Sequence, residues 1–135
     1  QVQVGRLVLS AVPVIHGKLP IHGFVAGDLA YITDASALPA STLSQLQGVE
    51  VLILNALRPE PHYSHFNLDQ ALEVAAQVGA KQTWFTHISH LMGTHETRDA
   101  TLPAGVGLAY DGLVLTREGV NWVTSMSVWR NSMRP

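Results

Sequence analysis

The chain has 135 residues and no cysteine, so it is long enough for one domain and cannot form a disulfide or a thiolate metal site by itself. Its net charge of −2 gives no electrostatic footprint for nucleic acid, and its apolar runs are too short to span a membrane. Charged residues make up only 13%, against roughly 25% in ordinary soluble domains, which predicts that a partner or a further part of a larger protein covers some of the surface.

The first third of the sequence predicts strands. Apolar residues recur between residues 2 and 15, and Gly5 interrupts them, which indicates a short strand, a turn or bulge, and a longer strand. Residues 21–26 and 29–33 are expected to form two further strands. The Gly27-Asp28 pair between them is typical of a hairpin turn.

The middle of the sequence predicts two helices separated by a buried strand. Proline is suited to a first helical position, so we expect a short helix over residues 39–46, with a strand at 49–54. The strongest helical pattern covers residues 67–78. Asn67 can accept hydrogen bonds from the first turn, and Gln70 completes a capping box.

The last third returns to short strands. The Asp111-Gly112 pair predicts a hairpin between the strands on either side of it. We expect one α/β unit with mixed strands over residues 1–135, and no structure is assigned to residues 125–135. The elements expected here are a strand at 83–86, a short helix or ordered loop at 94–101, strands near 106–110 and 113–116, and a strand at 120–124.

Four polar residues stand at the ends of hydrophobic strands or beside a helix start: His16, Asp34, His65 and His87. Imidazole nitrogens and carboxylate oxygens bind zinc and similar divalent ions at about 2.0–2.2 Å. An aspartate can also bridge two metal ions, and a buried aspartate without any partner would be unfavourable. The alternative is that these are ordinary hydrogen-bonded residues at strand ends.

The order of these residues resembles the second half of the metallo-β-lactamase-fold hydrolases. The likeness is greatest to their phosphodiesterase branch, which includes phosphoribosyl cyclic phosphodiesterases and tRNA 3′-processing nucleases. It covers roughly residues 7–116. The matching stretches are IHG at 15–17, YITDA at 31–35, SHFNLDQA at 64–71, FTHISH at 85–90 and YDG at 110–112.

The resemblance implies a fold and a set of roles. The fold is the C-terminal half of an αββα sandwich, with a mixed sheet and flanking helices. His16, Asp34 and His87 would be metal ligands, with Asp34 as the bridging carboxylate. His65 would contact the scissile phosphate and protonate the leaving oxygen, and N–H groups at the start of the helix at 67–78 would favour an anion beside it. The cofactor would be a divalent metal, zinc or manganese, with two ions in the intact parent.

Three further residues are candidates for support or substrate contact: His90, Arg58 and His62. His90 is equally suited to orient a metal-bound imidazole or to lie on the surface. His62 and Arg58 fit an ordinary exposed loop, although an arginine could hold a phosphate. The chain has no His-x-His-x-Asp-His cluster, which supplies the other half of the metal site in this family.

We therefore expect a metal-dependent hydrolase of a small phosphodiester in the intact parent, and no turnover by this chain alone. The alternatives are a non-catalytic, self-associating remnant of the fold, and a thioesterase or lactonase of the same superfamily. The expected partners are a second copy of the chain or a missing N-terminal half, and neither a membrane nor nucleic acid. The first 15 residues lack the features of a signal peptide, so a cytoplasmic location is expected.

Overall fold

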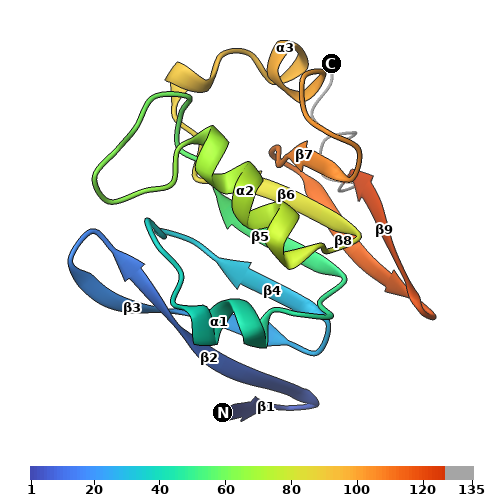
Figure 1. Cartoon of the computed structure of the whole chain (residues 1–135). Helices are drawn as coiled ribbons and strands as arrows, with labels where there is room; N and C mark the ends of the chain where they lie inside the picture. The colour runs from blue at the N-terminus through green and yellow to red at the C-terminus, as the bar shows by residue number, and fades with distance from the viewer. Residues whose placement is uncertain (127–135) are drawn as a thin grey trace.

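The computed structural model describes residues 1–126, which form one main sheet, flanking helices and a separate hairpin (Figure 1). No helix within these residues is long and apolar enough to cross a membrane. The elements in chain order are β1 (Val2–Val4), β2 (Leu7–His16), β3 (Leu19–Ala26), β4 (Leu29–Ile32), α1 (Ala40–Gln45), β5 (Val51–Asn55), α2 (Leu68–Val78), β6 (Gln82–Thr86), the 3₁₀ helix η1 (His90–Met92), α3 (His95–Asp99), β7 (Val106–Leu108), β8 (Leu113–Glu118) and β9 (Asn121–Met126).

The seven strands of the main sheet lie in sequence order, β1 to β7. Strands β1 to β4 form an antiparallel meander, and β4 to β7 are parallel to one another. The predicted mixed sheet is therefore confirmed. Parallel neighbours end at the same edge of a sheet, so the loops after β4, β5 and β6 are brought together there.

Helices α1 and α2 lie on one face of the main sheet (Figure 1). Asn67 caps α2 as the sequence predicts: its side chain accepts from the Gln70 N–H at 2.9 Å, and the Gln70 side chain accepts from the Asn67 N–H at 3.0 Å. Gly79 ends the helix in the left-handed conformation. The core between helices and sheet contains Val14, Ile32, Leu46, Leu52, Leu54, Ala71, Val78 and Phe85, among other residues.

The opposite face of the main sheet carries a transverse row of apolar residues. Strand register places these residues side by side, from β2 through β6. Phe24 and Tyr31, in the middle of the row, are each 45% exposed. We call this the apolar row; its members are Ala11, Phe24, Tyr31, Ile53 and Trp84.

The hairpin predicted at Asp111-Gly112 is wrong. The turn exists, with the Leu113 N–H donating to the Tyr110 carbonyl, but it carries the chain from the main sheet to a second, two-stranded sheet. Strand β7 pairs with β6, whereas β8 pairs with β9. The local sequence therefore predicts the turn correctly, but it does not determine that β7 pairs with β6 in the main sheet.

Candidate metal centre

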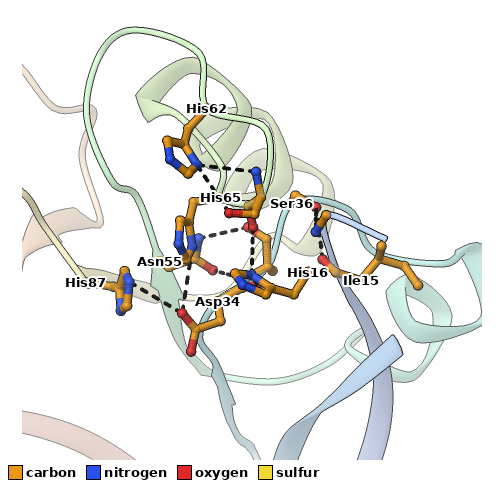
Figure 2. Close-up of polar contacts among 11 residues, drawn as sticks. Ile15, His16, Asp34, Ser36, Asn55, His62, His65 and His87 are labelled. Carbon is orange, nitrogen blue, oxygen red and sulfur yellow. Dashed lines mark hydrogen bonds and ion pairs between the residues drawn. The ribbon is translucent and has the colours of Figure 1, made fainter. Parts of the chain in front are cut away.

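Four of the predicted site residues gather at the edge where the parallel strands end (Figure 2). Asp34 follows β4 and His87 follows β6, on either side of β5. His16 is the last residue of β2, and His65 lies in the loop before α2. Three of the four side chains thus come from the ends of strands, and the fourth comes from the loop before α2.

The Asp34 carboxylate lies at the middle of this group. Its Oδ1 is 3.4 Å from His87 Nε2 and 3.7 Å from His65 Nδ1. One potential ligand atom from each of His16, Asp34 and His65 falls within 4.8 Å of the others. The His65 ring also packs against the rings of His16 and His87, with centroids 4.8 and 4.7 Å away. The structure thus brings together all four residues.

Hydrogen bonds orient the His16 ring. Its Nδ1 lies 2.8 Å from the Asp34 carbonyl oxygen and 2.9 Å from the Ser64 carbonyl oxygen. Carbonyl oxygens only accept, so Nδ1 carries the proton and donates to them. In the neutral ring this leaves the Nε2 lone pair free, which is the arrangement usual for a metal-binding histidine.

The backbone is strained at two of the four positions. Among residues 1–126, the two non-glycine residues with positive φ are Asp34, at 58°, and His87, at 57°. Such a conformation is unfavourable for a side-chain-bearing residue by about 1–3 kcal/mol, and it persists where the surrounding structure enforces it. The two residues in this conformation are those that follow the parallel strands β4 and β6.

His65 is more enclosed than His87, whose side chain is 40% exposed. The His65 side chain is 13% exposed, and Nδ1 is buried without a hydrogen-bond partner among residues 1–126. Burial lowers the pKa of His65 below its usual value, and the neighbouring His87 and His16 lower it further, although Asp34 opposes them. The His65 imidazole is therefore held neutral near pH 7.

Comparison with known proteins identifies the family to which the chain belongs. A family profile described as "Beta-lactamase superfamily domain" matches residues 1–88. The chain belongs to the beta-lactamase superfamily. A crystal structure described as a new diphosphatase from the PhnP family matches with a TM-score of 0.83 at 43% identity, over 87% of this chain and 46% of that one.

Two more distant structures support the beta-lactamase superfamily fold alone. A metallo-beta-lactamase fold protein from Bacillus subtilis matches with a TM-score of 0.62 at 18% identity, over 80% of this chain and 48% of that one. The short form of human tRNase Z matches with a TM-score of 0.60 at 20% identity, over 82% of this chain and 43% of that one. The chain is thus a mixed α/β fragment of a metallo-beta-lactamase-like fold, as predicted.

A curated relative is named for a reaction other than phosphate-ester hydrolysis. An octanoyltransferase from Porphyromonas gingivalis is 31% identical over 121 residues, which make up 87% of this chain and 25% of that protein. The chain therefore spans about a quarter of the length of this relative, and about half the length of the solved structures.

The beta-lactamase superfamily fold implies a divalent metal ion, and the residues present fit one. The His16 and His65 imidazoles and the Asp34 carboxylate offer ligand atoms within 4.8 Å of one another, and these are donors that zinc and manganese accept. His87 Nε2 lies 3.4 Å from the same carboxylate and can join this donor set. A cation beside Asp34 would offset the charge of a carboxylate that two histidines approach.

The other three predicted residues are less closely connected to Asp34. The His62 ring lies 5.1 Å from that of His65, and its Nδ1 accepts from the Ser64 N–H. Arg58 donates to the Glu60 and Pro61 carbonyls, so it shapes its own loop. His90 is exposed in η1, and no hydrogen bond or ion pair within residues 1–126 joins its imidazole to the metal centre.

The start of α2 differs from the expectation that its N–H groups are free for an anion. The Leu68 N–H donates to the Arg58 carbonyl at 2.9 Å, and the Gln70 N–H donates to Asn67 Oδ1. Two of the first N–H groups are thus used by the chain itself. The capping that makes the helix predictable thus occupies one donor that an anion could use, and the loop at Arg58 occupies another.

Sequence reasoning missed Asn55. This residue ends β5 between the strands that precede Asp34 and His87, and its side chain is fully buried. The available signal was a single asparagine directly after the apolar run 51–54. A buried amide needs hydrogen-bond partners, but nothing local indicates what those partners are.

Proposed function

We propose that the chain supplies one half of the active site of a metal-dependent hydrolase that cleaves a phosphodiester bond. The observation that carries the proposal is the Asp34 carboxylate, which is flanked by His87 and His65 at 3.4 and 3.7 Å with His16 close by. The 43% identity to a PhnP-family diphosphatase supports chemistry at phosphorus, since that protein is named for it.

The proposed metal ligands are His16, Asp34 and His87. When bound, a divalent ion would lower the pKa of a water molecule and neutralise charge on the phosphoryl oxygens. The protein's contribution is to hold the ligands in place before the ion arrives. His16 is fixed by two carbonyl acceptors, while Asp34 and His87 are fixed by a backbone conformation that leaves them little freedom.

The proposed role of His65 is to contact the phosphate and protonate the leaving oxygen. Unlike His16 Nδ1, which donates to two carbonyls, His65 Nδ1 has no hydrogen-bond partner within residues 1–126, so it is available to an incoming group. Its pKa is lowered by burial, but a phosphate anion against the ring would raise that pKa again. The ring would then take up a proton from solvent as the anion binds, and would pass that proton to the oxygen that leaves phosphorus.

The site needs a second contributor. His16, Asp34 and His87 can account for at most half of a two-metal site, so the rest must come from another segment or another chain. We expect the isolated chain to bind metal weakly and to show no turnover. The substrate class proposed is a small phosphodiester, and neither nucleic acid nor a membrane is proposed as a partner.

The test is a chimera that joins this chain to the part of the PhnP-family diphosphatase that it does not match. We expect the chimera to hydrolyse bis(4-nitrophenyl) phosphate in the presence of Zn²⁺ or Mn²⁺. The Asp34→Asn variant should lose most of that activity together with bound metal. Hydrolysis that persists unchanged in EDTA, or that ignores Asp34→Asn, would contradict the proposal.

Acyl chemistry is the second candidate, because a relative at 31% identity is named an octanoyltransferase. That name describes a protein of which the matched region is only 25%, so the support is weaker. A thioesterase or lactonase of this fold would show the same preference for acyl substrates. Assay of the chimera on an octanoyl thioester separates the two candidates, since faster cleavage of that substrate would favour acyl chemistry.

A further inference from the structure

Asn55 is a polar side chain buried within the apolar core. It is 0% exposed at the carboxyl end of β5, next to Leu54 and Ala56, which are also fully buried. Burying an amide is unfavourable unless its donors and acceptor are paired. The hydrogen-bond partners of the Asn55 amide therefore indicate its role.

Both hydrogen bonds of the Asn55 amide go to one residue, Ala35. The Ala35 N–H donates to Asn55 Oδ1 at 2.8 Å, and Asn55 Nδ2 donates to the Ala35 carbonyl at 2.9 Å. The backbone N–H can only donate and the carbonyl can only accept, so the orientation of the amide is chemically fixed. Figure 2 shows Asn55 within the group of site side chains.

Ala35 connects the segments that carry the site residues. It directly follows Asp34, and its carbonyl also accepts from the Phe66 N–H at 2.7 Å, one residue after His65. At the end of the same strand, the Ala56 N–H donates to the Thr86 carbonyl at 3.1 Å, one residue before His87. The end of β5 is thus bonded to the segments on both sides.

The two hydrogen bonds to Ala35 act next to a residue whose backbone conformation is unfavourable. Asp34 has φ of 58°, which a residue with a side chain rarely adopts. With the next residue held at both its N–H and its carbonyl, the Asp34 backbone has little freedom to relax to negative φ. The Asp34 carboxylate then remains between His87 and His65.

We propose that Asn55 is a positioning residue for the metal centre, which holds Asp34 in place through Ala35. The proposal rests on the proposed function, because it assumes that Asp34 binds metal. Asn55 itself touches neither metal nor substrate. Its loss should weaken metal binding by more than any loss of stability explains, since second-shell substitutions typically cost about 10–100-fold in metal affinity.

The side chains closest in shape to asparagine cannot make both hydrogen bonds to Ala35. In Asn55→Asp the carboxylate cannot donate to the Ala35 carbonyl, and in Asn55→Leu both hydrogen bonds are lost while the branched arrangement of heavy atoms is kept. Asn55→Ser is a milder variant that retains one hydroxyl. Thr42→Val is the matched control, because Thr42 is also fully buried and donates to the Pro13 carbonyl away from the centre.

The experiment measures Zn²⁺ affinity of the untagged chain by competition with a chromophoric chelator, together with thermal unfolding of each apo-protein. We expect Asn55→Asp and Asn55→Leu to bind Zn²⁺ at least about tenfold more weakly than the unmodified chain. Asn55→Ser should lie between, and Thr42→Val should keep its affinity within about threefold even where it unfolds at a similarly reduced temperature.

Two results would overturn the proposal in distinguishable ways. If the unmodified chain binds Zn²⁺ but the folded Asn55 variants bind it equally well, Asn55 is a structural residue only. If the unmodified chain and Thr42→Val both fail to bind Zn²⁺ and hydrolysis by the chimera persists in EDTA, the proposed function fails, and the positioning role fails with it. If only the isolated chain fails to bind, the same variants are compared in the chimera. Should Asn55→Leu not fold, Asn55→Ser carries the comparison.

Discussion

Among single residues, His65 has the surroundings that most clearly suggest a chemical role. It lies against His16, His87 and Asp34, yet its Nδ1 has no hydrogen-bond partner in the part of the chain that the structure describes. A ligand and a proton donor could both occupy this position. Loss of the imidazole would remove bound metal if His65 is a ligand, whereas it would slow turnover alone if His65 is a proton donor. Substitution therefore distinguishes the two roles.

We expect His65→Ala to lower turnover of a phosphodiester by the chimera about 10²–10⁴-fold, the usual contribution of a positioned general acid. Bound metal per protein, measured by elemental analysis, should be unchanged. His90→Ala, at an exposed position, is the control and should alter neither quantity. A His65→Ala protein that has lost its metal would instead make His65 a ligand.

The lowered pKa of His65 also predicts a dependence of stability on pH. Folding favours the neutral ring, so the unfolded chain binds more protons between the lowered pKa and the ordinary value of 6.5. The free energy of unfolding should therefore rise with pH through this window, and this part of it is lost as the pH falls below 6.5.

Urea unfolding in EDTA at several pH values measures this effect without bound metal. His65→Gln should show a smaller change in the free energy of unfolding between pH 7 and pH 5 than the unmodified chain. His22→Gln removes an exposed imidazole on β3 and serves as the control. Equal pH dependence in the unmodified chain and His65→Gln would show that His65 does not titrate as inferred.

Among the secondary-structure elements, the β8–β9 hairpin is attached to the main sheet by few polar contacts. Asp28, in the turn between β3 and β4, accepts hydrogen bonds from Arg117 and from Trp122 Nε1. Burial raises the pKa of Asp28, but these hydrogen bonds outweigh it and the pKa is lowered overall. The attachment should therefore be intact at neutral pH and weaken as the pH falls through 3.8 and below.

We expect Asp28→Asn to loosen the hairpin while leaving the main sheet folded, because the ion pair with Arg117 is lost. Hydrogen exchange of the Trp122 indole N–H, followed by NMR, should become faster. Glu118→Gln removes a carboxylate from the hairpin itself and should have no such effect. Unchanged exchange in Asp28→Asn would mean that other contacts hold the hairpin, such as the Gln82 bond to the Trp122 carbonyl.

At the scale of the whole molecule, the apolar row leaves one sheet face open within the described residues. Phe24 and Tyr31 are half exposed at its middle, and the chain has few charged residues to offset them. Burial of apolar surface contributes roughly 25 cal/mol per Å². We therefore propose that a second copy of the chain covers this face when nothing else does, as a two-fold dimer.

Light scattering at micromolar concentration should give the mass of a dimer for the isolated chain. Phe24→Lys should shift the population toward monomer, since it places a charge in the middle of the apolar row. Tyr63→Lys is the control, because Tyr63 is 85% exposed on a loop that is not part of this face. A stable monomer at the same concentration would show that the chain tolerates the open face.

The sequence by itself determined the elements whose signals are local. Asn67 and Gln70 cap α2 through bonds across three residues, and the turn at Gly27-Asp28 joins adjacent strands, so neighbouring residues contain the information. The four site residues were predicted because polar residues at the ends of apolar strands or beside a helix start are visible in the sequence, and because their order resembles a known family. The rule that parallel strands end at one edge accounts for Asp34 and His87, whereas His16 ends an antiparallel strand and His65 lies in a loop.

Only the tertiary structure decided the features that depend on distant partners. Asn55 and Ala35 are 20 residues apart, and no periodicity indicates that bond. The positive φ of Asp34 and His87 is equally invisible, because local preference opposes it and the packed sheet enforces it. The Asp111-Gly112 turn failed as a hairpin for the same reason: which strand β7 joins depends on burial against β6, a contact that no local signal contains.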